Sequence, residues 1–230
     1  MDQYQFGKTI YHNPLQREAD VQAFRLEGQA SITFPNGRLR MENLLEAEEG
    51  QKANFVFWCP EEFPPGIAVS WNFWPLREPG LCILFFAAGG RNGEDLFDPG
   101  LTPRTGEYNQ YHHGDINALH VSYFRRRWPQ ERAFHTCNLR KSYGFHMVAL
   151  GADPLPPVAD ADPPYRIQLI KCGPEVAFYI NELQIFRWVD DGQTYGPVLG
   201  GGKIGFRQMA PLIGEYADFT VQAVEKGLDP

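Results

Sequence analysis

Histidine, tyrosine and arginine side chains are concentrated in one part of the chain, between Tyr108 and Arg140. The stretch EYNQYHHGDINALHVSYFRRR, residues 107–127, holds three of the six histidines and three consecutive arginines. An imidazole can remove a proton, a phenol can return one, and a guanidinium can neutralise a carboxylate. This combination predicts a lyase that eliminates across a carboxylated sugar, with His120 as the base and Tyr108 or Tyr111 as the acid.

The charge of this part of the chain differs from that of the whole protein. The formal net charge is −7, yet residues 104–146 carry seven basic side chains against three acidic ones. The excess of acid elsewhere opposes attraction to a phosphate backbone, and we expect no nucleic-acid partner. An acidic oligo- or polysaccharide held by guanidinium groups is the predicted ligand. The alternative is a solvated, arginine-rich edge that prevents strands from aggregating.

Strand alternation indicates which side chains could share a surface with His120. Along this strand Leu119, Val121 and Tyr123 fall on one face, whereas His120, Ser122, Phe124 and Arg126 fall on the other. Residues 67–74 and 136–140 alternate in the same way, although a shift of one residue in register would invert the open face. We predict the following substrate-binding residues: Asn72, Trp74, Arg104, Arg126, Asn138 and Arg140.

The elements that must position these residues are short strands. Runs rich in Phe, Val, Ile, Tyr and Trp alternate with Gly- and Pro-rich breaks along the whole sequence. This spacing is typical of an all-β, antiparallel two-sheet sandwich. We expect a single domain spanning residues 1–230. The residues predicted to lie inside the sandwich are Leu119, Val121, Ile167, Phe178, Ile204 and Phe219.

Several longer motifs carry a resemblance to a known family. They are GDINALHVSYFRR (114–126), HTCNLRKSYGF (135–145), GPVLGGGKIGFRQM (196–209) and YADFTVQAV (216–224). In this order the sequence resembles the YesU-like family of bacterial proteins over roughly residues 55 to 225. The resemblance implies a concanavalin A-like jelly roll and a role in carbohydrate metabolism, often of uronate-rich polysaccharides. It supplies no accepted set of catalytic residues.

Other functions of the same fold stay open. A retaining glycoside hydrolase needs two carboxylates about 5 Å apart. The segment NGEDLFD offers Glu94, Asp95 and Asp98, but its spacing does not place an acid and a nucleophile on one strand face. A glycoside hydrolase is therefore weaker than a lyase as a prediction. A non-catalytic carbohydrate-binding protein is a further alternative, since one fold can host both roles, and so is a structural protein whose basic strand pairs with another subunit.

Cofactor, metal and membrane signals are weak. We expect no required cofactor, because the four cysteines are dispersed and no histidine motif has transition-metal spacing. Concanavalin A-like sandwiches often hold a structural Ca²⁺, and that resemblance makes Asp218, with Glu215, the candidate ligand. No apolar run reaches the ~18 residues of a membrane span. The N-terminal sequence lacks the pattern of a secretory signal, so we expect a cytoplasmic protein.

Overall fold

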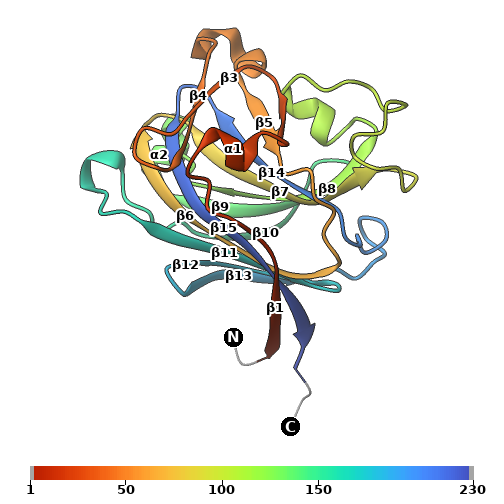
Figure 1. Cartoon of the computed structure of the whole chain (residues 1–230). Helices are drawn as coiled ribbons and strands as arrows, with labels where there is room; N and C mark the ends of the chain where they lie inside the picture. The colour runs from red at the N-terminus through yellow and green to blue at the C-terminus, as the bar shows by residue number, and fades with distance from the viewer. Residues whose placement is uncertain (1–2, 228–230) are drawn as a thin grey trace.

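Two antiparallel β-sheets pack face to face in the computed structural model, which describes residues 3–227 (Figure 1). The strands of the eight-stranded sheet are β1 (Tyr4–Asn13), β3 (Ala30–Thr33), β4 (Leu39–Asn43), β6 (Gly66–Arg77), β11 (Tyr165–Cys172), β12 (Glu175–Ile180), β13 (Leu183–Val189) and β15 (Ile213–Lys226). The strands of the seven-stranded sheet are β2 (Arg25–Glu27), β5 (Phe55–Trp58), β7 (Leu81–Gly90), β8 (Ile116–Tyr123), β9 (Thr136–Ser142), β10 (His146–Ala152) and β14 (Lys203–Met209). The helices are short: α1 (Glu18–Val21), α2 (Pro129–Ala133), and the 3-10 turns η1 (Ala47–Ala53), η2 (Tyr108–Tyr111) and η3 (Val158–Asp160). The predicted all-β two-sheet sandwich is confirmed.

The order of strands in each sheet brings distant parts of the sequence together. It is β13-β12-β11-β6-β15-β4-β3, with β1 also paired to β15, in one sheet, and β10-β9-β8-β7-β14-β5-β2 in the other. The pairing of β1 with β15 places both ends of the described chain at the same end of the sandwich (Figure 1). By contrast, β7, β8, β9 and β10 are consecutive in the chain and also adjacent in the sheet. This part of the chain contains the basic stretch, residues 104–146.

The space between the two sheets is filled by one continuous apolar core. All six residues predicted to lie inside belong to it, and each is at most 2% exposed. On β8 the alternation holds, with Leu119 and Val121 in this core and His120 on the other face. Burial of each such aliphatic or aromatic side chain stabilises the fold by about 1.5–3 kcal/mol.

A second apolar layer lies on the outer face of the seven-stranded sheet. Trp58 and Phe85 point outward from β5 and β7, yet both are fully buried. They are covered by the segment between β7 and β8, which contributes Leu96 and Tyr111 and is the light green loop of Figure 1. This segment covers only part of the face. Met147 and Leu150, on the edge strand β10, are 51% and 56% exposed, so the outer face of β10 is open, and on β9 only Arg140 is half-buried rather than buried.

Within residues 3–227, no helix has the length and apolar character that a membrane crossing requires. The boundary of a single domain at 1–230 and the cytoplasmic location stay predictions.

Candidate functional site

The side chains on the outer face of the seven-stranded sheet form two rows that cross its strands. Residues paired directly in an antiparallel ladder point to the same side, so each row can be followed from strand to strand. The first row, from β10 to β5, is Met147, Arg140, His120, Phe85, Gly205 and Trp58. The second row, from β10 to β2, is Leu150, Asn138, Ser122, Ile83, Arg207, Val56 and Glu27.

His120 and Tyr108 form a hydrogen-bonded pair at the centre of the first row. The Tyr108 hydroxyl lies 2.6 Å from Nε2 of His120, whose ring is fully buried against Phe85. Burial, followed by the charges of Arg140, His112 and Arg207, holds the pKa of His120 well below its usual value. Burial also raises the pKa of Tyr108 to about 12. Both groups are therefore uncharged at neutral pH, and the hydrogen bond joins the phenol oxygen to Nε2 of the neutral imidazole.

Two arginines beside this pair lack an acidic partner. Arg140 lies opposite His120 on β9, donates to the carbonyl of Phe145 at 3.1 Å, and stacks 3.7 Å from the centre of the Phe145 ring. The Arg207 guanidinium is fully buried, donates to the Gly106 carbonyl, and lies 5.0 Å from the centre of the Tyr108 ring. Neither forms an ion pair with any carboxylate of residues 3–227. The site is therefore a region of uncompensated positive charge.

Asn138 adds a polar group to this region. It precedes Arg140 by two residues on β9, is 3% exposed, and its Oδ1 has no hydrogen-bond partner in the described part of the chain. An unpaired buried carbonyl of this kind costs about 1–3 kcal/mol. The structure thus brings together His120, Tyr108, Asn138 and Arg140, of which His120 and Asn138 are buried and Tyr108 and Arg140 are partly exposed.

The second candidate acid, Tyr111, has different surroundings. Its hydroxyl donates to Oε2 of the buried Glu27 at 2.8 Å. Glu27 also accepts from Nε1 of Trp58 at 2.9 Å and is paired with Arg104. Because the Tyr111 hydroxyl is held by Glu27, Tyr108 is the phenol that remains beside His120.

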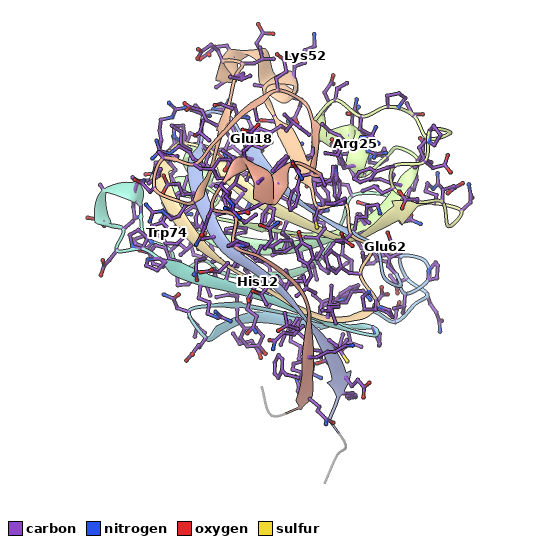
Figure 2. All side chains as sticks on the ribbon, viewed as in Figure 1. His12, Glu18, Arg25, Lys52, Glu62 and Trp74 are labelled. Atoms are coloured by element: carbon purple, nitrogen blue, oxygen red, sulfur yellow. The ribbon has the colours of Figure 1, made fainter. Side chains whose placement is uncertain are left out.

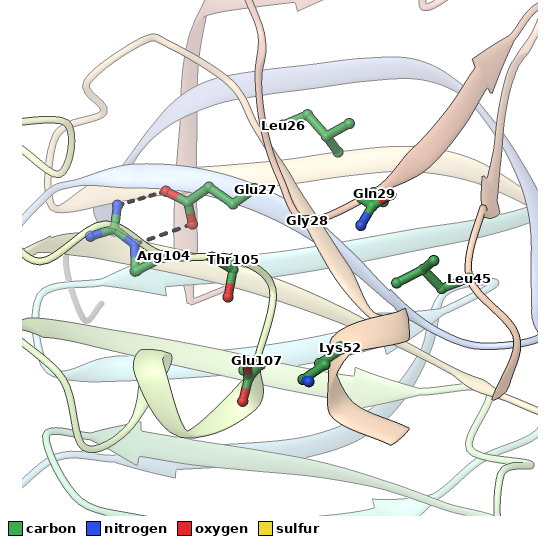
Figure 3. Close-up of a pocket in the computed structure, with 9 residues that line it drawn as sticks. All are labelled: Leu26, Glu27, Gly28, Gln29, Leu45, Lys52, Arg104, Thr105 and Glu107. Carbon is green, nitrogen blue, oxygen red and sulfur yellow. Dashed lines mark hydrogen bonds and ion pairs between the residues drawn. The ribbon is translucent and has the colours of Figure 1, made fainter. Parts of the chain in front are cut away.

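Arg104, a predicted substrate-binding residue, is the partner of Glu27. Its Nε and Nη2 lie 3.1 and 2.8 Å from the two carboxylate oxygens, and Nη2 also donates to the Leu96 carbonyl. The pair forms one wall of a cavity of about 370 Å³, which Lys52 and Glu107 border on the opposite side (Figure 3). The charge of Arg104 is thus already neutralised within the protein.

The placement predicted for Arg126 is wrong. Phe124 has a positive φ of 47°, which ends the strand alternation and turns its ring into the core between the sheets. Arg126 is therefore directed away from His120, toward the buried Asp153, with Nη1 3.2 Å from Oδ2 and Nη2 bonded to the Leu155 carbonyl. It is 1% exposed and does not line the open face.

Asn72 and Trp74 also lie elsewhere. Both are on β6, which is in the eight-stranded sheet, whereas His120 and Arg140 are in the other sheet. Alternation correctly points them outward, but the outer faces of two packed sheets point in opposite directions. In Figure 2, Trp74 and Arg25, from the outer faces of the two sheets, accordingly lie on opposite sides of the view. Asn72 donates to Asp218, and Trp74 stacks under Arg38.

The candidate calcium ligand, Asp218, accepts that bond from Asn72 at 2.9 Å. Glu215 is buried and forms ion pairs with Arg38 and Arg40. In the described residues, no group of three or more His, Cys, Asp or Glu side chains is placed to hold a metal ion. Calcium binding at Asp218 stays a prediction.

Two contributors to the site were not singled out from the sequence. Arg207 is separated from His120 by 87 positions, and the alternation of Arg207 with Gln208 leaves open which of the two faces outward. Glu27 lies in a short strand outside the basic segment. Only the pairing of β14 and β2 into the seven-stranded sheet brings them beside Tyr108 and Tyr111.

Sequence comparison shows which family the chain belongs to. Residues 8–221 match the family described as "Domain of unknown function (DUF1961)". The chain belongs to this family. It is 58% identical over 224 residues to the uncharacterized protein YesU of Bacillus subtilis (strain 168), covering 97% of this chain and all of that protein, so the resemblance to the YesU-like family is confirmed.

Solved structures agree with the fold of this DUF1961 chain. A protein of unknown function with a galectin-like fold from Bacillus subtilis is 56% identical, with a TM-score of 0.94 over 97% of this chain and 100% of that chain. A β-1,3-1,4-glucanase (lichenase) from a mouse hindgut metagenome has a TM-score of 0.58 at 12% identity, covering 93% and 98% of the two chains. The carbohydrate-binding module CBM66 from Bacillus subtilis has a TM-score of 0.52 at 9% identity, covering 87% and 95%. The jelly-roll sandwich is shared with all three.

Proposed function

We propose that this protein acts on a uronate-containing saccharide as a lyase, at the outer face of the seven-stranded sheet beside Tyr108 and Arg140. The observation that supports this most is the hydrogen-bonded Tyr108–His120 pair beside two arginines without acidic partners. A carboxylated sugar would supply the missing negative charge, since Arg140 is the guanidinium nearest the open surface. The proposal is also consistent with fold neighbours that include a glucanase and a carbohydrate-binding module.

In the proposed reaction each group takes one step. Arg140, with Asn138, would hold the sugar carboxylate, which makes the proton on the adjacent carbon more acidic. Tyr108 is the group that meets the sugar, because His120 is fully buried behind it. As the phenol passes its proton to His120 Nε2, its oxygen removes the sugar proton. A carbon–carbon double bond forms, the glycosidic carbon–oxygen bond breaks, and Tyr108 returns a proton from His120 to the leaving oxygen.

The ligand itself would prepare this relay. In the ligand-free protein, burial and the neighbouring cations depress the pKa of His120, so it accepts a proton poorly. A carboxylate bound at Arg140 offsets part of that positive charge and raises the pKa of the imidazole. Proton transfer from Tyr108 then becomes easier only when an acidic sugar is present.

Two other functions of the fold have weaker support. A hydrolase needs two available carboxylates, but Glu27 and Glu131, which border this region, are already paired with Arg104 and Arg125. A saccharide-binding protein without catalysis is favoured by one observation, the complete burial of His120.

The mass of the products distinguishes a lyase from a hydrolase and from a binding protein. We expect uronate-containing oligosaccharides incubated with the protein to yield fragments whose masses sum to that of the substrate, together with ultraviolet absorbance from the new double bond. Hydrolysis would add the mass of one water, and a binding protein would leave the substrate intact. Either of those results would overturn the lyase proposal.

Variants test the assigned residues. Arg140→Ala should weaken binding of an acidic saccharide about 10- to 100-fold, the loss expected for a charge-assisted hydrogen bond, and should leave a neutral saccharide nearly unaffected. Arg166→Ala is the matched control, because Arg166 is exposed on the outer face of the other sheet. His120→Gln should retain binding and lower turnover by about 10²–10⁴. Parental binding by Arg140→Ala would refute the site.

A further inference from the structure

The outer face of the edge strand β10 is apolar. Met147 and Leu150 are 51% and 56% exposed on this face, and Ala152 is exposed beside them. The titratable residue of the strand, His146, pairs with Lys141 and points toward the other sheet. The solvent-facing side of an antiparallel sheet is usually polar, and an edge strand usually carries charges. The outer face of β10 departs from both rules.

The apolar surface continues onto the turn before β10. Phe145 is 43% exposed, and its ring meets the Tyr108 ring edge-on at 5.5 Å between centres. The Arg140 guanidinium stacks on Phe145, and Met147 is the direct cross-strand neighbour of Arg140. The apolar strip, as we call it, therefore begins beside Tyr108 and Arg140 and follows β10 away from them. Its residues are Phe145, Met147, Leu150 and Ala152.

The charges around the strip indicate what covers it. Residues 134–152, which include β9, β10 and the turn between them, contain no aspartate or glutamate. A symmetric contact between two copies of the chain through this face would bring two unpaired Arg140 guanidinium groups toward each other, which is unfavourable. A ligand that has a carboxylate for Arg140 and an apolar group for the strip matches the surface better.

An unsubstituted polyuronate matches the surface poorly, because each of its units carries a carboxylate. Leu150 lies opposite Asn138, two residues or about 7 Å along β9 from Arg140. The next guanidinium in this direction belongs to Arg125, which bonds to Thr136 but is already paired with Glu131. A second carboxylate would therefore meet apolar side chains and no free cation.

We infer that the apolar strip binds an apolar substituent on the sugar unit next to the uronate held at Arg140. The inference rests on the proposed function and narrows its substrate class to acidic saccharides with such substituents, of which an O-acetyl group is a simple case. Each methyl group buried against Met147 or Leu150 should raise affinity about 3- to 5-fold.

A ratio of two affinities tests this inference. Saturated oligogalacturonates of one length, with and without O-acetyl groups, are titrated calorimetrically into the His120→Gln variant, so that the ligand stays intact. The acetylated form should bind about 3- to 10-fold more tightly. Adding Met147→Ser or Leu150→Ser should bring the ratio closer to one, because each removes apolar contact and keeps Arg140.

Two further variants are controls for this ratio. Leu183→Ser is the matched control, since Leu183 is 58% exposed on β13, the edge strand of the other sheet, and it should leave the ratio unchanged. Arg140→Ala should weaken binding of both forms alike and so preserve the ratio. Thermal unfolding of Met147→Ser and Leu150→Ser should match that of the parent, because both side chains are already half exposed.

The outcomes distinguish failure of the inference from failure of the proposed function. Equal affinity for the two forms, or a ratio that neither Met147→Ser nor Leu150→Ser changes, would overturn the inference, while weaker binding by Arg140→Ala would still support the proposed function. If neither form binds, the proposed uronate ligand is wrong and the inference fails with it.

Sedimentation of the ligand-free protein tests the other occupant of the strip. We expect the parent and Leu150→Ser to have the same oligomeric state. A parent dimer that Leu150→Ser converts to a monomer would make the strip a contact between copies and overturn the inference.

Discussion

At the scale of single residues, the two tyrosines of η2 have separate roles although they lie three positions apart. The Tyr108 hydroxyl bonds to a neutral imidazole beside the open face, whereas the Tyr111 hydroxyl bonds to the buried carboxylate of Glu27. A phenol bonded to a buried charge contributes to stability, and one bonded to a potential proton acceptor can take part in chemistry.

The two tyrosines lead to a prediction in which one substitution lowers stability and the other lowers turnover. Tyr111→Phe should lower the free energy of unfolding by about 1.5–3 kcal/mol, the usual contribution of a hydrogen bond to a charged group, and leave ligand binding intact. Tyr108→Phe should cost less stability but abolish turnover. Denaturant unfolding and the product-mass assay measure the two effects. Loss of turnover in Tyr111→Phe with normal turnover in Tyr108→Phe would reverse the assignment.

At the scale of elements, most arginine side chains of the basic stretch connect separate segments of the fold. Arg125 pairs with Glu131 of α2, and Arg132 donates to the carbonyls of Arg126 and Arg127. Arg126 ties the end of β8 to the segment that follows β10 through Asp153. The arginines thus divide into structural ones with acidic or carbonyl partners and a smaller group whose charge is uncompensated.

The structural role of Arg126 leads to a stability prediction. Arg126→Ala leaves Asp153 buried without its cation, which should lower the free energy of unfolding by about 3–5 kcal/mol. Arg127→Ala, which removes a half-buried neighbour stacked on Trp128 that has no acidic partner among residues 3–227, should cost less than about 1 kcal/mol. Denaturant titration measures the free energy of unfolding of both variants and of the parent. Parental stability of Arg126→Ala, together with loss of saccharide binding, would restore Arg126 to the ligand site.

At the scale of the whole molecule, burial of the imidazole couples stability to pH. The pKa of His120 is depressed in the folded protein, and that of His112 is lowered to about 4, mainly by burial. Below pH about 6.5 the unfolded chain therefore binds protons that the folded chain excludes. Since stability rises with pH wherever the unfolded state binds more protons, it should fall as the pH drops below that value.

The size of this effect can be checked with one variant. The His120 contribution should approach at most about 1.4 kcal/mol per pH unit below pH 6.5. His120→Gln cannot take up the proton in either state, so its unfolding free energy should depend less steeply on pH between the usual histidine value and pH 5. Identical pH profiles for parent and variant would show that His120 titrates normally in the folded protein.

The local sequence pattern was sufficient to predict the class of fold and many of the core residues. Alternation along β8 and β9 placed Leu119 and Val121 inward and His120, Asn138 and Arg140 outward, because the direction of a side chain on a strand depends only on its position in the strand. Gly- and Pro-rich breaks between apolar runs identified an antiparallel sandwich for the same local reason.

Only the tertiary structure decided which outward-pointing side chains lie on the same face of the molecule. Alternation sends Asn72 and Trp74 to solvent but cannot say that β6 lies in the other sheet, since strand order depends on long-range pairing. It also cannot anticipate the positive φ at Phe124 that directs Arg126 to Asp153, or the pairing of β14 that brings Arg207 beside Tyr108. The sequence by itself determined an acidic sandwich with one cation-rich segment and with His120 on an outer face. Packing between distant segments determined which cations keep a free charge, because each arginine is neutralised or left unpaired by neighbours that the chain supplies from elsewhere.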